Sequence, residues 1–211
     1  MRGSARITYD SPMAEAAVRI STQRRQASKA ASRAAILEAA RRVATRDGAR
    51  DLSLRGVAAE AGFAPAALYG YFRNKDELLL ALAADDLSAL ARAMRDAPPS
   101  GGLAGAGTAA LDILRGAETM AAASAALTGA PSENNKLGDA ERLFNGRLIG
   151  ALKALSDASG VPATGRQGQC DVLLLAAALS GLAMFSRSGR LDALGFTPEE
   201  MIARLDSRFR G

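Results

Sequence analysis

The sequence contains no histidine, no tryptophan and only one cysteine in 211 residues. Without histidine it lacks the commonest general base and the commonest metal ligand. The single cysteine, Cys170, cannot form an internal disulfide or a cysteine zinc cluster, and it suits a reducing cytoplasm. The sequence also shows no nucleophile–base pair and no phosphate-binding loop. The composition therefore argues against an enzyme, and we expect no metal and no cofactor.

Aromatic residues are rare, at 4% of the chain, and β-branched residues are scarce as well. Alanine and leucine dominate instead, which favours helices. We therefore expect an all-α protein, and its length allows one or two domains with a sizeable core. The longest predominantly apolar run, Val172–Phe185, is shorter than the ~20 residues that a membrane span needs. It predicts a buried helix, and we expect a cytoplasmic protein with no membrane partner.

The charge is distributed unevenly along the chain. Residues 1–82 carry 14 Lys/Arg against 8 Asp/Glu, whereas residues 83–211 carry 13 against 14. A basic N-terminal part on a neutral body is the electrostatic footprint of a DNA-binding protein. A generally basic, solvated surface is the alternative interpretation.

The N-terminal segment combines two features. Its first four residues, Met-Arg-Gly-Ser, are typical of an expression-vector leader, so we expect the natural start near Met13. The stretch Arg19–Arg33 then holds five basic residues, no acidic residue and a polar, aperiodic start. It predicts a leader remnant and flexible basic arm over residues 1–27, which leads into a first helix at about 29–46. The arm is either a groove-binding element or a solvated tail.

Residues 53–75 carry the most informative pattern. Ser53 is a good N-cap for a short second helix, and Gly62 supplies the left-handed turn conformation that other residues resist. Pro65 fits the first turn of a third helix that ends at Tyr71. Tyr69 and Tyr71 cannot both share its buried face, so we expect at least one to be exposed. The layout is that of a helix-turn-helix, which places one helix in the major groove of DNA. The apolar positions are Leu54, Val57, Ala58, Ala61, Leu68 and Phe72.

Helical periodicity continues through the rest of the chain. An Asn74–Glu77 capping box starts the fourth helix, and Thr197–Glu200 starts the last one. The segment 167–187 is apolar all round at its centre, so it should be buried on several sides. The expected helices are 74–95, 103–127, 139–159, 167–187 and one from residue 198 onward. The expected buried face of 139–159 is Leu143, Phe144, Leu148, Leu152 and Leu155.

Residues 32–80 carry a dense set of motif residues: Ser32-Arg33-Ala34-Ala35-Ile36-Leu37-Glu38-Ala39-Ala40, Gly48, Ser53-Leu54-Arg55, Val57-Ala58, Ala61-Gly62, Leu68-Tyr69, Tyr71-Phe72 and Lys75-Asp76-Glu77-Leu78-Leu79. In these residues the chain resembles the TetR/AcrR family of bacterial transcriptional repressors. The resemblance implies a DNA-binding domain over residues 28–75 and a ligand-binding and dimerisation domain over 76–211. The DNA-contacting residues that it implies are Arg33, Ser53, Arg55, Pro65, Ala66, Ala67, Tyr69, Gly70, Tyr71 and Lys75.

The third helix departs from the family pattern. Ala64 and Ala67 stand where hydroxyl residues are common, and Gly70 stands where a polar side chain is common. This helix can therefore offer few hydrogen bonds to bases, although it can contact thymine methyls. We infer that the basic arm supplies affinity that the helix lacks.

The expected function is a ligand-responsive repressor that binds a palindromic operator as a homodimer. Residues 139–159 and 167–187 should form the dimer surface. A hydrophobic small-molecule inducer should release the DNA, and by family analogy the target is a multidrug efflux operon, with a fatty-acid or acyl-thioester sensor as the other possibility. An architectural DNA-binding protein, whose C-terminal domain docks a protein partner without an inducer, is the alternative from another class. The expected ligand contacts are Leu114, Met120, Phe144, Leu148, Met184 and Phe185.

Overall fold

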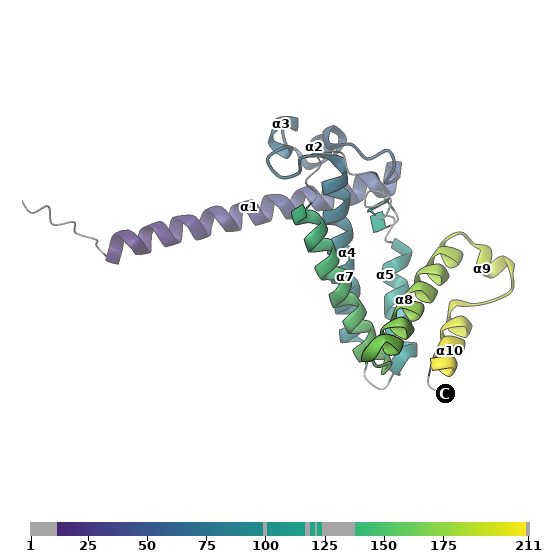
Figure 1. The fold of residues 1–211 in the computed structure, drawn as a ribbon. Coiled ribbons are helices and arrows are strands. Elements are labelled where there is room, and N and C mark those ends of the chain that lie inside the picture. The colour runs from purple at the N-terminus through teal and green to yellow at the C-terminus, as the bar shows by residue number, and fades with distance from the viewer. Residues whose placement is uncertain (1–11, 99–100, 117–118, 121, 124–137, 210–211) are drawn as a thin grey trace, which may run out of the picture.

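The computed structural model describes residues 12–98, 101–116, 119–120, 122–123 and 138–209. Within these residues the secondary structure is helical and contains no strand, which confirms the all-α prediction. The C-terminal part of α1 forms a small head with α2 and α3 at one end of the molecule, and the helices from α4 onward form a body beside it (Figure 1). Residues 117–118, 121 and 124–127 of the expected helix 103–127 lie outside the described residues.

The first helix is much longer than the sequence predicted. α1 spans Pro12–Asp47, so residues 12–28 continue the helix instead of forming a flexible arm. This part of α1 projects away from the rest of the protein (Figure 1). No glycine or proline lies between Met13 and Asp47, and alanine, arginine and glutamine are strong helix formers. Residues 19–31 are exposed, so helix propensity accounts for the helix there without burial of these side chains. We call residues 19–32 the basic extension.

Two short helices complete the head. α2 spans Leu54–Ala61 and α3 spans Pro65–Leu68. Their apolar side chains close a small core against α1. Burial of such side chains contributes roughly 1.5–3 kcal/mol each. The fully buried members of this core include Ile36, Val57, Leu68 and Phe72.

α4 spans Lys75–Asp96 and runs from the head into the body. There it packs against α5, Gly102–Gly116, and α7, Gly138–Ser159. α8, Gly165–Arg187, lies against α5 and α7. The short α9, Arg190–Ala193, precedes α10, Pro198–Phe209, which returns to cover α5 and α8. The helix α4 therefore connects the head with the body, where it contacts both α5 and α7.

The predicted helix starts are present with one change. In α10, the Thr197 N–H donates to Glu200 Oε2 at 2.7 Å, and the Glu200 N–H donates to Thr197 Oγ1 at 3.2 Å. In α4, Asn74 Oδ1 accepts from the Glu77 N–H at 2.8 Å. The Glu77 carboxylate, however, accepts from the Arg73 N–H at 2.7 Å. The N-termini of α4 and α10 therefore both have hydrogen-bonded backbone N–H groups. At α4 these bonds fix where the helix begins beside the head.

The expected burial of α7 and α8 is only partly correct. Leu155 and Phe144 are buried, but Leu143 and Leu148 are 38% and 37% exposed. On α8 one face is buried, and Leu173 and the other large apolar residues of the opposite face are exposed. Composition predicted that face to be buried because it cannot distinguish a core from a surface that another chain covers. The exposed apolar residues of α7 and α8 are Leu143, Leu148, Ile149, Leu173, Leu174, Met184 and Phe185.

α8 is the one described helix that is long and apolar enough to cross a membrane by length and composition. The core helix of a soluble protein passes the same test. Val172, Leu175 and Leu179 of α8 are buried in the body, and α5, α7 and α10 contact this helix. We therefore interpret α8 as a core helix with one exposed apolar face. This face and the neighbouring exposed apolar residues of α7 together form what we call the α7/α8 face.

Candidate nucleic-acid interface

The turn between α2 and α3 is fixed by local bonds. Ser53 caps α2 as predicted, since its Oγ accepts from the Gly56 N–H at 3.1 Å. Gly62 adopts the left-handed conformation with φ 71°, which side chains resist. The following Phe63 N–H donates to the Ala58 carbonyl at 2.9 Å and closes the end of α2. The helix-turn-helix predicted from residues 53–75 is therefore present.

The third helix is shorter than predicted. α3 ends at Leu68, and residues 69–71 form a turn instead of a further helical turn. The Gly70 N–H donates to the Ala67 carbonyl at 3.1 Å, and the Tyr71 N–H donates to the Leu68 carbonyl at 2.9 Å. These tighter i→i−3 bonds, together with the low helix propensity of glycine, end the α-helix early. We call residues 64–71 the reading segment.

The exposed side of the reading segment is small and apolar. Ala64, Pro65, Ala66 and Ala67 are exposed, as is Gly70, whereas Leu68 is fully buried. The segment can thus approach a base edge closely and contact thymine methyls, but it offers few side-chain hydrogen bonds.

The two tyrosines of the reading segment differ. Tyr69 is 53% exposed, which confirms that at least one tyrosine faces solvent. Tyr71 is half-buried, and its ring meets Phe63 edge-on with centroids 6.4 Å apart. The hydroxyl of Tyr69 is therefore the more accessible hydrogen-bond donor in the segment.

Several basic residues border the reading segment. The Arg33 guanidinium lies 5.2 Å from the centroid of the Phe72 ring, a cation–π contact that holds it beside the head. Arg55 is exposed, and no hydrogen bond or ion pair with another described residue engages it. The Lys75 ammonium donates to the Arg50 carbonyl and keeps further N–H donors for another acceptor.

Other basic residues of α1 brace the head internally. Arg42 and Arg46 of α1 both contact Glu60 of α2, at 2.7 and 3.1 Å. Hydrogen bonds from Arg42 and then Arg46 hold the pKa of Glu60 below its usual range. Arg46 also pairs with Asp47 at 2.9 Å. These two arginines are therefore neutralised, and they join α1 to α2.

The basic extension is not neutralised in this way. Among the residues described, no ion pair or hydrogen bond engages Arg19, Arg24, Arg25 or Lys29, and all four are exposed. Arg25, Lys29 and Arg33 recur every four residues, so they share one side of α1. We call these three residues the basic stripe. It ends at Arg33, where α1 meets the head.

A partly open cavity lies between α4, α5, α7 and α8. Its volume is about 110 Å³. Ser180 is its one polar side chain, and that hydroxyl donates to the Ala176 carbonyl at 2.8 Å. The cavity can therefore select a ligand by shape more than by hydrogen bonds. Its walls are Leu87, Leu90, Met94, Leu114, Met120, Leu148, Ala151, Leu152, Leu155, Ala176, Leu179 and Ser180.

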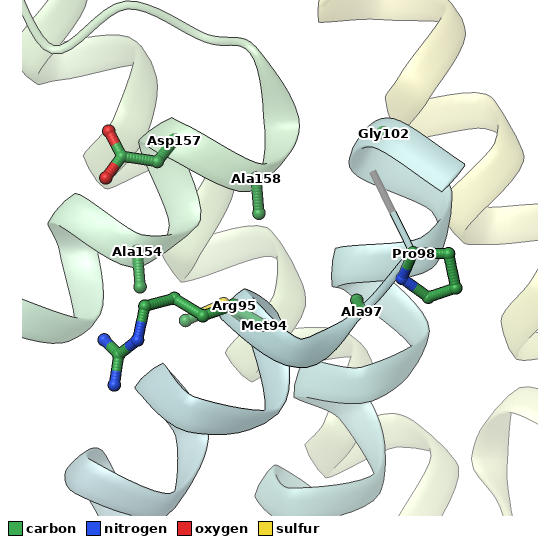
Figure 2. A pocket seen from close by; sticks show the side chains of 8 residues that line it. All are labelled: Met94, Arg95, Ala97, Pro98, Gly102, Ala154, Asp157 and Ala158. Carbon is green, nitrogen blue, oxygen red and sulfur yellow. The ribbon is translucent and has the colours of Figure 1, made fainter. Parts of the chain in front are cut away.

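An outer cleft of about 230 Å³ opens at the end of α4. Figure 2 shows its lining, with Arg95 and Asp157 on one side and Pro98 on the other. Met94 lines both this cleft and the inner cavity. The two spaces therefore share one lining residue, a flexible methionine.

The predicted ligand contacts divide into three groups. Leu114, Met120 and Leu148 line the inner cavity. Phe144 is buried but does not line it. Met184 and Phe185 lie on the exposed face of α8, so the structure does not bring them to the cavity. The prediction missed the wall that α4 supplies, Leu87, Leu90 and Met94, although their helical spacing marked one apolar stripe.

Comparisons with known proteins agree with this geometry. Residues 36–82 match the family model described as bacterial regulatory proteins, tetR family. No curated protein matches the sequence significantly. A TetR transcriptional regulator from Rhodococcus sp. RHA1 is 21% identical, with a TM-score of 0.63 over 86% of this chain and 97% of that chain. A TetR family regulator from Marinobacter aquaeolei VT8 is 19% identical, with a TM-score of 0.56 over 86% and 97%.

The regulator FadR from Bacillus subtilis, solved in complex with stearoyl-CoA, is also similar. It is 18% identical, with a TM-score of 0.54 over 82% of this chain and 95% of that chain. These likenesses extend over the head and the body, and the resemblance inferred from residues 32–80 is confirmed. Residues 36–82 match the tetR-family model, and the chain as a whole has the fold of TetR transcriptional regulators.

Proposed function

We propose that this protein is a cytoplasmic transcriptional repressor that binds a palindromic operator as a homodimer and is released by a hydrophobic small molecule. In this proposal residues 28–75 bind DNA, and residues 76–211 bind the ligand and dimerise. The observation that carries it is the exposed reading segment, which follows the turn at Gly62, on a head that also presents the cationic residues Arg33 and Arg55. Phosphate contacts from these cations would set the register, and the segment would read the groove.

Selection of bound sites from random double-stranded DNA tests this proposal. A dimer that reads two half-sites should enrich a palindrome whose half-sites lie about 34–36 Å apart, one turn of DNA. A/T steps should be favoured where the alanines meet thymine methyls. Binding without any enriched sequence would leave a non-specific DNA binder, and the repressor proposal would fail.

The α7/α8 face supports the homodimer. Ile149 and Leu174 are 68% and 62% exposed, which is unusual for large apolar side chains that cluster on adjacent helices. At Gly146, Gly150 and Gly181, a Cβ atom would meet nothing within 4 Å. Open space at these glycines would let a second pair of helices approach closely. The predicted surface, residues 139–159 and 167–187, contains all of these positions.

The inner cavity supports the inducer. Its 110 Å³ is below the roughly 300–1,000 Å³ of typical ligand pockets, so an entering ligand must separate the walls. α4 supplies part of the wall and also begins at Lys75, directly behind the reading segment. Displacement of α4 would therefore shift the head, and two heads on one palindrome tolerate little displacement.

The apolar lining suits a drug-like aromatic or an acyl chain. A multidrug efflux operon is the preferred target by family analogy. A fatty-acid or acyl-thioester sensor is the second candidate, since the similar FadR fold holds stearoyl-CoA. Stearoyl-CoA that releases the operator at micromolar concentration would favour the second candidate. If the protein is monomeric in solution although the α7/α8 face is exposed, the alternative of an architectural DNA-binding protein that docks another protein is favoured.

Lys75→Ala should weaken binding to all DNA sequences alike. Lys75 sits at the first turn of α4, where backbone N–H groups and the ammonium together suit a phosphate. The slope of log affinity against log salt should fall by about 1 per protomer. Arg92→Ala removes the same charge from the exposed surface farther along α4 and serves as the control. If the salt slope of Lys75→Ala equals that of the wild type, Lys75 does not contact a DNA phosphate.

Tyr69→Phe and Tyr71→Phe should each lower operator affinity with little change in melting temperature. A hydroxyl that donates to a phosphate oxygen contributes roughly 1.5–3 kcal/mol, whereas an exposed hydroxyl contributes little to folding. Titration of the operator and thermal unfolding of each variant separate these contributions. A drop in melting temperature without a drop in affinity would mean that the hydroxyl has a structural role.

A further inference from the structure

The carboxylate of Asp86 on α4 joins three parts of the molecule. Its Oδ1 accepts from Arg41 Nη2 at 2.7 Å and from Arg41 Nε at 3.3 Å. Its Oδ2 accepts from the Thr119 hydroxyl at 2.5 Å. Arg41 and Asp86 are 45 residues apart, and Thr119 and Asp86 are 33 apart. Each carboxylate oxygen therefore holds a different segment, one from the head and one from the body.

Asp86 is the shielded partner of Arg41. The side chain of Asp86 is 13% exposed, whereas Asp85 and Glu38, which also pair with Arg41, are 49% and 63% exposed. Exposed pairs contribute little because water screens them, while charge-assisted bonds away from water are stronger. Burial alone would lower the pKa of Arg41, but hydrogen bonds to Asp86 and then Asp85 outweigh it and raise that pKa. The guanidinium thus stays charged at any physiological pH.

Thr119, at the opposite end of the Arg41–Asp86–Thr119 hydrogen bonds from Arg41, lies next to a residue that lines the cavity. Thr119 is 5% exposed, and the next residue, Met120, lines the cavity. Leu87, which follows Asp86 on α4, lines it too. A ligand that separates the cavity walls would move Met120 and Leu87 apart, and the Thr119–Asp86 hydrogen bond lies between the same two segments.

We propose that Thr119, Asp86 and Arg41 are positioning residues that connect the cavity wall to the angle of the DNA-binding head. With the Thr119 bond made, Asp86 is held in the orientation that receives Arg41, and α1 is fixed against α4. When the cavity expands, Thr119 leaves, and Asp86 loses the donor that fixes its plane. The Arg41 contact then loosens, and the head changes its angle on α4. The inference rests on the proposed function and assigns its regulation to named atoms.

Thr119→Val tests the connection because it removes the hydroxyl and keeps the shape. The dimer should bind the operator at least roughly fivefold more weakly, the lower end of common coupling between sites. Thr119→Ser keeps the hydroxyl and should retain wild-type affinity. Thr108→Val is the matched control, since Thr108 on α5 is exposed and its hydroxyl donates only to its own helix, at the Ala104 carbonyl. Affinity is measured well below the melting temperature, so that a loss of stability alone leaves it unchanged.

Asp86→Asn is a second, independent test of the connection between the cavity wall and the head. It keeps the size of the side chain and removes the charge that attracts Arg41, so it should weaken operator binding as well. Because both residues act through one carboxylate, the losses in the Thr119→Val/Asp86→Asn double variant should not add. Hydrogen exchange of amides in α2 and the reading segment should rise in both single variants.

The outcomes separate this inference from the proposed function. If the wild type selects no operator, the proposed function fails. If the wild type binds but Thr119→Val binds equally well, the connection fails and the repressor proposal stands. Additive losses in the double variant, or equal losses in Thr119→Ser, would also overturn the connection.

Discussion

A Leu174→Glu variant should sediment as a monomer and lose affinity for the full palindrome by roughly 10²–10⁴-fold, the usual advantage of binding two linked sites. Leu174 is 62% exposed in the centre of the apolar stretch of α8. A carboxylate there would be buried without a partner if a second copy covered this face. Affinity for an isolated half-site should change little, because the head is untouched.

Leu194→Glu is the matched control for this variant. Leu194 is 65% exposed, as exposed as Leu174, but it follows α9 and lies outside the α7/α8 face. It should remain dimeric and bind the palindrome normally. Sedimentation velocity and operator titration report the two properties independently. A Leu174→Glu protein that stays dimeric would assign the α7/α8 face to another partner and favour the architectural alternative.

The head was predictable because its signals are local. The Ser53 cap, the Gly62 turn and the apolar positions of α2 each fix their own few residues, and the structure places all of them as expected. The end of α3 was not predicted, because Gly70 is compatible with either a helical turn or the tighter turn that is present. The difference is one of a few tenths to about 1 kcal/mol, which is too small for the sequence pattern to settle.

The surfaces of the body were less predictable. An apolar residue on α7 or α8 can face the core, a ligand or a second chain, and its type is the same in each case. Phe185 and Leu148 both fitted a ligand pocket by composition, yet only Leu148 lines the cavity. The Arg41–Asp86–Thr119 contacts were not predictable either. Such polar contacts join residues tens of positions apart, and only the packing of α1 on α4 brings them together.

The basic extension shows how two sequence signals can conflict. Its polar, aperiodic composition predicted a flexible arm, whereas its alanine and arginine content favours a helix. As a helix it holds Arg25 and Lys29 at fixed positions on the side of α1 that leads to Arg33 and the reading segment. An ordered row of cations loses less entropy on binding than a mobile tail does.

Deletion of residues 1–26 should therefore leave a folded dimer that binds its operator at least tenfold more weakly, a loss of about 1.4 kcal/mol. The head core begins at Ile36, so the deletion removes no buried side chain that the structure describes. Each lost phosphate contact should also reduce the salt slope by about 0.9, so the loss should be largest at low salt. Operator titration at several salt concentrations measures both quantities.

The helical form of the extension allows a sharper comparison than deletion alone. Arg25→Gln and Arg24→Gln remove the same charge from adjacent exposed positions, but only Arg25 belongs to the basic stripe. If the stripe lies along the DNA backbone, Arg25→Gln should weaken binding clearly more than Arg24→Gln. Equal small losses would indicate general attraction by net charge. A truncated dimer that binds as tightly as the full chain at physiological salt would instead require the alanine-rich reading segment to obtain its affinity from methyl contacts, DNA shape and the phosphate contacts of the head.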